Sequence, residues 1–368
     1  TRIYPWGPLR LAFAEGTYAN QIITTAAVLG SSLPAPLTAA ITVTNSDYPL
    51  VVSGTTTISG NIITGPLGVT PGRYQGEDLT NERYHSGNVI ALPQPPVLEL
   101  DSSVINGYLR DMEIRRGQCR KLLSASPTFG IKETQLWQEN RSISVENNAF
   151  VNGLEISQHD AIYSLFVDGR IEISGSTQIR GTIEITSKSY ILVGDSALID
   201  QALLYAEDFI VIGDGVRFSG IAISPHRIVV RDKALLQYPA MLIVNAPSDS
   251  CADGCGIFLR TAIPAEVSCV IAVANHSDRI SEPTILVDSN VTLTGTLLRQ
   301  GTVDLRGTLF GSVWTSVFRF YAPPTTYINW LRNCRIDRSK LIFVPPLPLL
   351  AVDSSRPDLR IVWQEETK

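Results

Sequence analysis

The fold is decided by the stretch RIEISGSTQIRGTIEITSKS (170–189), which continues as YILVGDSALIDQALLYAED (190–208), FIVIGDGVRFSGIAISPH (209–226) and RIVVRDKALLQYPAMLIV (227–244). Apolar triplets begin at Ile191, Ile210 and Ile228, so one register returns after 19 and then 18 residues. Short repeats rich in Ile and Val and punctuated by Gly, Asp and Ser are typical of stacks in which each unit buries its apolar face against its neighbours.

Each repeat has room for three short strands and three turns, because a strand rises roughly 3.3 Å per residue. Val216 and Phe218, then Ile221 and Ile223, alternate with other residues in the period of two that such strands need. Leucine-rich repeats have a similar spacing but need a fixed Leu/Asn framework, which this sequence lacks. The sequence therefore predicts an all-β, right-handed parallel β-helix (β-solenoid) of about 18–19 residues per turn.

Composition narrows the function classes. The 368 residues are 44% hydrophobic and 18% charged, which fits a β-rich protein with a large core. The net charge of −5 argues against a nucleic-acid partner. No apolar run reaches the roughly 18 residues of a transmembrane helix, so membrane attachment is expected only through an amino-terminal anchor that is absent or was removed before Thr1.

Four regions are expected along the chain. The segments LVVSG, TTISG and NIITG look like three strands of one solenoid turn, whereas the period of 18 is lost past Phe320. Open ends of a stack need atypical caps. The regions are the amino-terminal strands and first turn (1–64), a Gly/Pro-rich loop and short helix packed on the solenoid (65–158), the main solenoid (159–320), and a carboxy-terminal cap with a mobile tail (321–368).

The carboxy-terminal cap is assigned to residues 321–350, and the polar tail from Asp353 is expected to be mobile. The apolar face of the cap is expected to consist of Tyr327, Trp330, Leu331 and Ile336. A helix is predicted over 101–125, because Val104, Ile105, Tyr108, Leu109 and Met112 follow helical spacing and Gly117 offers an end. Its basic residues Arg115, Arg116, Arg120 and Lys121 are expected on a solvated face.

Aspartates recur with the repeat. Asp195, Asp214 and Asp232 follow the triplets in one register, and Asp288 of ILVDS is expected at the equivalent place. Carboxylates stacked about 4.8 Å apart could bind Ca²⁺ or supply the paired acids of polysaccharide cleavage. An acid needed at every turn favours a structural corner instead, since Asp accepts hydrogen bonds from turn amides. No metal or cofactor is therefore predicted.

Two further features carry hypotheses. Arg73, Tyr74, Tyr84 and His85 lie in the Gly/Pro-rich loop and could bind glycans or partner proteins, or could simply pack along the solenoid. Cys251 and Cys255 could form a disulfide across a Gly-Asp turn in an oxidising compartment, or could be two thiols.

The repeat IVIGDGVRFSGIAIS (210–224) resembles the bactofilin-type solenoids, which form filaments. The Trp6-Gly7 turn, the segment Pro49–Gly60 and the segment Tyr327–Leu341 resemble uncharacterised bacterial envelope parallel β-helix proteins associated with pilin-like or secretion-like components. These resemblances imply a place in the bacterial cell envelope or on the cell surface, periplasmic or extracellular. The implied partners are other envelope or filament proteins, further copies of the chain, or glycans, and no catalytic residues carry over.

Two functions remain open at this point. The preferred prediction is a non-enzymatic structural or adhesive envelope protein. The rival is a polysaccharide-active β-helix enzyme, a lyase or glycoside hydrolase, which needs non-repeating acids together with Arg or Lys in a groove on one flank. The set that would serve it is Glu155, Asp160, Glu172 and Glu184 with Arg170 and Arg180; Glu172 and Glu184 are expected on the same side.

Overall fold

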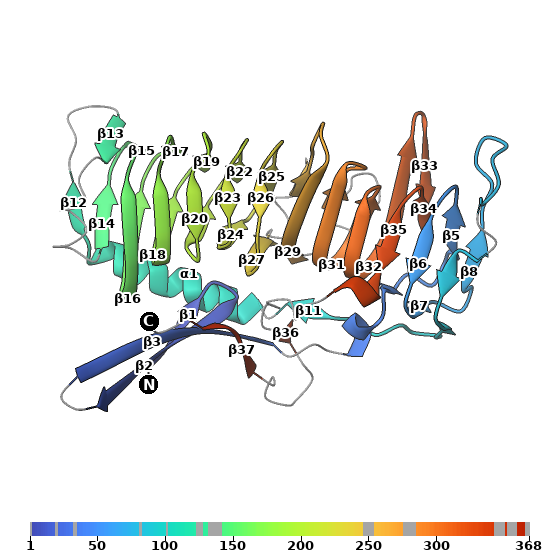
Figure 1. Ribbon diagram of the computed structural model, residues 1–368, viewed down its shortest axis with the longest axis horizontal. Helices are drawn as coiled ribbons and strands as arrows, with labels where there is room; N and C mark the ends of the chain where they lie inside the picture. The colour runs from blue at the N-terminus through green and yellow to red at the C-terminus, as the bar shows by residue number, and fades with distance from the viewer. Residues whose placement is uncertain are drawn as a thin grey trace.

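A computed structural model describes residues 2–18, 21–31, 35–80, 83–100, 102–122, 128–131, 142–245, 254–274, 285–341, 350–351 and 359–364. This part of the chain is mostly β-strand, with one α-helix, α1 (Ser102–Gly117), and two short 3-10 helices, η1 (Ala35–Thr38) and η2 (Arg338–Lys340). A long, curled parallel sheet runs the length of the molecule, and α1 lies along one side of it (Figure 1). None of the described helices is long and apolar enough to cross a membrane.

The long sheet is built from strands that pair with the strand two or three positions further along the chain. Ile191, Ile210 and Ile228 are register partners, so the spacing of 19 and 18 residues is confirmed. The strands that carry this first ladder are β17 (Ile171–Ser174), β19 (Tyr190–Val193), β22 (Phe209–Ile212), β25 (Arg227–Val230), β28 (Gly256–Leu259), β30 (Ile285–Val287) and the end of β31 (Val291–Leu305).

Two more ladders complete each repeat. The second contains the first half of β18 (Gln178–Ser187), then β20 (Leu198–Asp200), β23 (Arg217–Phe218) and β26 (Leu235–Leu236). The third contains the second half of β18, then β21 (Leu203–Ala206), β24 (Ile221–Ser224), β27 (Ala240–Asn245), β29 (Ala265–Ala274), β31 and β32 (Thr308–Ala322). Inward side chains such as Ile191, Ile199 and Leu204 are fully buried in one apolar core.

Strands at one end of the long sheet precede β17. They are β12 (Arg120–Leu122), β13 (Thr128–Ile131), β14 (Ser142–Val145), β15 (Asn148–Asn152) and β16 (Glu155–Val167), all in parallel pairs. The chain reaches them from the opposite end through α1, which explains why α1 spans the side of the sheet (Figure 1).

The opposite end is made from two parts of the chain that are far apart in sequence. The strands concerned are β4 (Ile41–Val43), β5 (Leu50–Ser53), β6 (Thr57–Ser59), β7 (Ile62–Thr64), β8 (Val69–Pro71), β9 (His85–Ser86), β10 (Val89–Ala91), β33 (Thr325–Ile328), β34 (Trp330–Arg332) and β35 (Arg335–Asp337). Val313 of β32 pairs with Ile41, Ile41 pairs with Ile62, and Ile62 pairs with Val89. The three segments LVVSG, TTISG and NIITG are indeed strands, but they extend the stack beyond β32 rather than start it.

The predicted cap is therefore corrected. Ile336 of β35 pairs with β32 on one side and with β6 on the other, and Leu331 of β34 pairs with β5. Both side chains are buried because strands from residues 50–59 cover them, so this segment lies inside the stack. The strands at that end of the described sheet are β8, β9 and β10. Residues 342–349 of the predicted cap lie outside the described residues.

A small antiparallel sheet joins the two ends of the chain. It contains β1 (Arg2–Trp6), β2 (Leu9–Tyr18), β3 (Gln21–Ser31) and β37 (Leu359–Gln364), in that order. The expectation of a mobile tail from Asp353 is wrong for 359–364, since these residues pair with β3. A two-stranded sheet links β11 (Glu99–Leu100) to β36 (Leu350–Ala351).

The outward side of the third ladder is also apolar, and it is covered. Its residues form a second buried cluster with α1 and the first antiparallel strands, and we call this side the covered flank. The sheet contributes Phe166, Leu203, Tyr205, Ile221, Ile223, Met241, Ile243, Val270, Ala272, Leu298 and Trp314. The cover contributes Trp6, Leu9, Leu11, Phe13, Leu37, Ile105, Tyr108 and Met112. Burial of the cover residues Ile105, Tyr108 and Met112 confirms the helical spacing read from the sequence, and α1 ends at Gly117.

Polar contacts fix α1 on the covered flank. Glu184 of β18 is fully buried, and it accepts hydrogen bonds from the Tyr108 hydroxyl at 2.8 Å and from Arg115 Nη2 at 2.7 Å. Burial and the nearby Glu184 carboxylate raise the pKa of Tyr108, so the hydroxyl keeps the proton that it donates. Arg116 forms an ion pair with Asp168. Arg115 and Arg116 therefore face the sheet, not a solvated face as expected.

Candidate functional site

The outward side of the first ladder has no helix or strand over it in the described part of the chain, and we call it the open flank. Its register places outward residues in three rows along the stack. The first row is Arg170, Tyr190, Phe209 and Arg227; the second is Glu172, Leu192, Val211, Val229, Phe258, Leu286 and Asp304; the third is Gly194, Gly213, Arg231, Arg260, Asp288 and Arg306.

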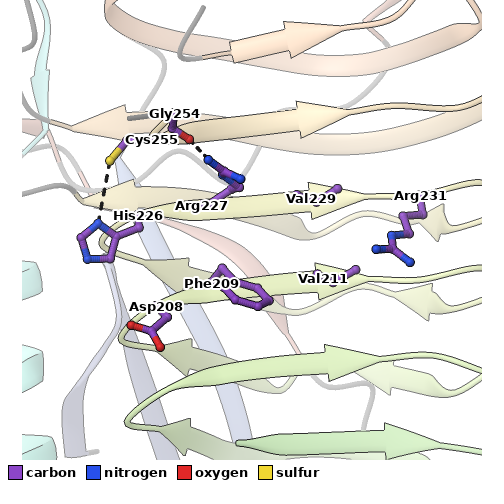
Figure 2. A pocket seen from close by; sticks show the side chains of 9 residues that line it. All are labelled: Asp208, Phe209, Val211, His226, Arg227, Val229, Arg231, Gly254 and Cys255. Atoms are coloured by element: carbon purple, nitrogen blue, oxygen red, sulfur yellow. Dashed lines mark hydrogen bonds between the residues drawn. The ribbon is translucent and has the colours of Figure 1, made fainter. Parts of the chain in front are cut away.

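A cavity of about 420 Å³ lies on the open flank, over strands β22 and β25. Its lining is Asp208, Phe209, Val211, His226, Arg227, Val229, Arg231, Gly254 and Cys255. Figure 2 shows Asp208, His226 and Cys255 at one end of the two strands and Arg231 at the other. The volume falls in the range of sites for small organic ligands, which combine apolar walls with a few polar groups.

The corner end of the cavity is polar, and hydrogen bonds fix the positions of its side chains. Asp208 accepts a hydrogen bond from Ser189 Oγ at 2.9 Å, and Arg227 Nε donates to the Gly254 carbonyl at 2.9 Å (Figure 2). The Cys255 Sγ lies 3.8 Å from His226 Nδ1. Phe209 stacks on Tyr190 with ring centroids 4.7 Å apart and planes at 7°, so the ring that lines the cavity has a fixed position.

The other end is cationic. Arg231 and Arg260 are exposed register partners on adjacent strands, and neither forms an ion pair with any described residue. Arg260 lies over the Phe258 ring at 5.1 Å from its centroid. Further along the third row, Arg306 binds the buried Asp304 carboxylate through two hydrogen bonds of 2.8 and 2.6 Å. Burial raises the pKa of the Asp288 carboxyl, while Arg306 and Arg260 act in the opposite direction.

The predicted corner acids divide into two groups. Asp195, Asp214 and Asp232 share one register and take the second place of a four-residue turn, closed by backbone hydrogen bonds such as Val216 N to Gly213 O. The residue after each Asp has a left-handed φ, namely Ser196 (65°), Gly215 (73°) and Lys233 (60°). Asp232 also accepts a hydrogen bond from the Ala262 amide at 2.5 Å.

Asp288 does not share the register of the other three aspartates, and this part of the prediction is wrong. Leu259 pairs with Val287, so Asp288 is the register partner of Arg260, one residue earlier than the column of corner acids. Asp288 is the first residue of its four-residue turn, because its carbonyl accepts the closing hydrogen bond from the Val291 amide. The other three aspartates are the second residue of theirs. Within the described residues, no group of three His, Cys, Asp or Glu side chains could hold a metal ion.

The acids considered for polysaccharide cleavage do not converge. Glu172 lies on the open flank and pairs with Arg170 Nε at 3.2 Å, whereas Glu184 is buried beneath α1 on the covered flank. The expectation that these two carboxylates share one side is wrong, since β17 and the second half of β18 belong to different ladders. Glu155 is exposed, and Arg180 donates to Gln178 at 2.8 Å. The side chain of Asp160 lies outside the described residues.

The loop residues predicted to bind a ligand are largely used in packing. Tyr74 is buried against Phe320 and Tyr327, with Arg332 over its ring at 4.2 Å, so its prediction as an exposed binding residue is wrong. Tyr84 packs against the main core, and its ring centroid lies 4.9 Å from that of His85. His85 belongs to β9, which pairs with β6. Arg73 remains exposed and donates to the Gly76 carbonyl.

The structure describes Cys255, Cys269 and Cys334 but not Cys251. Cys251 lies outside the described residues, so its disulfide with Cys255 stays a prediction. Cys269 and Cys334 are buried, and burial raises the pKa of both thiols, to about 12 for Cys334.

The row that contains Arg231, Arg260 and Arg306 was not predicted from the sequence, although the repeat contained its signal. Arg231, Arg260, Asp288 and Arg306 each follow the third apolar residue of a triplet, in IVVR, IFLR, ILVD and VDLR, where VDL carries an acid at its middle place. Aligning the triplets alone hides this row, because Gly194 and Gly213 hold the same place in the earlier repeats.

No protein-family model, curated protein or solved structure matches this chain. The likeness to envelope β-helix proteins and to bactofilin-type solenoids therefore rests on the sequence segments alone.

Proposed function

We propose that the chain is a right-handed parallel β-helix that acts as a non-enzymatic structural or adhesive protein of the bacterial cell envelope, within a pilus-like or surface assembly. The observation that carries this proposal is the regularity of the stack. The same parallel pairing and the same acid-bearing turn recur from β19 to β25, as expected of corners that shape the fold.

Engagement of the flank acids supports the same proposal. Glu172 and Asp304 each form an ion pair with an arginine two residues away in the sequence, and Glu184 holds α1 through hydrogen bonds from Tyr108 and Arg115. Retaining and inverting glycosidases need two carboxyl groups on either side of one bond, about 5–10 Å apart. Among the residues that line the cavity, Asp208 is the one carboxylate. A rigid stack with such a surface suits display and binding.

A polysaccharide-active enzyme is the second candidate, favoured by one observation. Asp208 and His226 lie together at the corner end of the cavity, where an acid or base could reach a bound sugar (Figure 2). This candidate predicts turnover that Asp208→Asn and His226→Gln each reduce by at least about a hundredfold.

Electron microscopy of the purified protein together with glycan-binding and depolymerisation screens tests the proposal. We expect elongated particles or filaments, bound glycan, and no release of oligosaccharides or unsaturated sugar products. Released products that disappear in Asp208→Asn would overturn the non-enzymatic proposal and support the enzyme. Glycan or partner binding without products would leave the adhesive function as the explanation.

A further inference from the structure

The pair Arg231 and Arg260 needs a physical explanation. The two residues immediately follow the paired ends of β25 and β28, where Val230 and Leu259 are register partners, so their backbones lie about one strand spacing apart, about 4.8 Å. Like charges placed directly opposite each other on neighbouring strands destabilise a sheet. Both side chains are exposed, and neither has an ion-pair partner among the described residues. Two adjacent exposed arginines without ion-pair partners can bind an anion through charge-assisted hydrogen bonds.

The acids of the cavity do not neutralise this pair. Asp208 immediately precedes β22, and Arg231 immediately follows Val230, which is the register partner of Ile212 at the end of β22. Asp208 and Arg231 therefore lie at opposite ends of the paired strands, five residues or roughly 16 Å apart along the strand direction. That exceeds the distance of about 8 Å over which salt screens exposed charges under physiological conditions. Among the nearer acids, Asp232 accepts a hydrogen bond from the Ala262 amide and Asp214 is exposed at the turn, while Asp288 follows Arg260 in the third row and interacts with it electrostatically. None of these three acids forms an ion pair with Arg231 or Arg260 within the described residues.

An apolar strip lies directly beside the two arginines. Val211, Val229 and Phe258 follow one another in the second row, and Val211 and Val229 line the cavity. Aliphatic and aromatic side chains of this kind pack against the C–H faces of sugar rings, whose hydroxyl groups need polar partners at the edge. Asp208 and His226 are available at the corner end for such hydroxyl groups (Figure 2).

We propose that the open flank binds an acidic polysaccharide, with sugar carboxylates on Arg231 and Arg260 and sugar rings over Val211 and Val229 in the cavity. Neighbouring arginines are about 4.8 Å apart, comparable to the length of one sugar unit, so carboxylates of successive units can engage successive strands. The proposal rests on the adhesive function above and names its ligand class. A nucleic acid is disfavoured by the exposed Asp214 and Asp208 and by the net charge of −5.

The test uses the whole chain and four probes: oligogalacturonate, which has one carboxylate on each sugar, the matching neutral galactose oligosaccharide, poly-glutamate and single-stranded DNA. Affinities are measured by isothermal titration calorimetry at low and high salt. The variant is R231Q/R260Q, and the control is R217Q, which removes an exposed arginine from β23 on a different ladder. Circular dichroism and the thermal midpoint verify that both variants fold like the unaltered protein.

We expect oligogalacturonate to bind, the double variant to bind it about tenfold or more weakly, and R217Q to stay within about twofold. D214N should strengthen binding, since it removes a nearby negative charge. Equal binding of poly-glutamate or DNA would overturn the glycan assignment, and unchanged binding by R231Q/R260Q would overturn the site. Preference for the neutral oligosaccharide would refute this inference but leave the adhesive function intact, whereas cleavage of the probe would refute the adhesive function itself.

Discussion

The covered flank and the open flank are formed by different strands of the same repeat, and they have different outward residues. On the covered flank, Leu203, Ile223 and Met241 are fully buried beneath α1 and the antiparallel sheet. On the open flank, a row of apolar residues that includes Val229 and Phe258 lies beside a row that contains exposed arginines such as Arg231. An outward face that is apolar throughout needs a cover, whereas a mixed face can meet water and a ligand.

The comparison teaches where to look for function in a stacked fold. Inward residues and the covered flank are fixed by packing, so their variation is limited by the core. The open flank is free of that constraint, and unpaired charges there carry information about a ligand. The predictions below test this difference, beginning with the largest expected effect.

Placing a charge on each flank should give opposite results. Met241→Arg puts a guanidinium among the buried side chains of the covered flank and should lower the free energy of unfolding by about 4 kcal/mol or more. Val229→Arg, in the middle of β25 on the open flank, should change it by less than about 1 kcal/mol. Urea unfolding followed by circular dichroism measures both. A similar decrease in the free energy of unfolding in both variants would contradict the distinction between the two flanks.

The polar anchor of α1 should be the next most sensitive point. Arg115→Met leaves the buried Glu184 carboxylate without its cation and should lower stability by about 3 kcal/mol. Arg110→Met, on the exposed side of the same helix, is the matched control and should cost less than about 0.5 kcal/mol. Chemical denaturation of the two variants side by side checks this, and equal effects would contradict a specific role for Glu184.

The corner acids should contribute little, and unequally. Asp232→Ala removes the acceptor of the Ala262 amide and should cost about 1 kcal/mol. Asp214→Ala, at the equivalent turn but exposed, should stay within about 0.5 kcal/mol. Differences in the midpoint of urea unfolding measure both. A large loss in Asp214→Ala would show that the acids act together along the stack, as a bound cation would require.

The smallest effect should be a dependence on pH at Asp288. Burial raises the pKa of this carboxyl, so the folded state disfavours its charged form. The resulting penalty is absent below the ordinary aspartate pKa of about 3.9 and develops as the pH rises through the raised value. Asp288→Asn should therefore be slightly more stable than the unaltered chain at pH 7, with an advantage that shrinks towards pH 4. An advantage that grows as the pH falls would contradict the direction of the shift.

Local sequence signals predicted most of the stack. The triplets at Ile191, Ile210 and Ile228 are register partners, Ile285 pairs with Val303 as their 18-residue spacing suggested, and the helix occupies Ser102–Gly117 within the predicted range. These features depend on neighbours within one repeat, where periodicity carries the information.

The arrangement of the end of the stack could not be predicted in this way. Ile58 and Ile336 are paired across almost the whole chain, and no local pattern reports which distant strand will lie beside a given one. The open-flank site was missed for a related reason. Arg231 and Arg260 become neighbours only when β25 and β28 are aligned by their pairing, because β26, β27 and further connecting residues separate them in the sequence.

The two methionines of the chain provide the most direct test of the division into two flanks. Met112 of α1 and Met241 of β27 both belong to the buried cluster between the sheet and its cover of α1 and the first antiparallel strands, and both are at most 2% exposed. In native protein treated with dilute hydrogen peroxide, mass spectrometry should find both thioethers unmodified, and both should oxidise once urea unfolds the chain. Rapid conversion of Met241 to its sulfoxide in the folded protein would contradict the account, because it would mean that this flank is not covered.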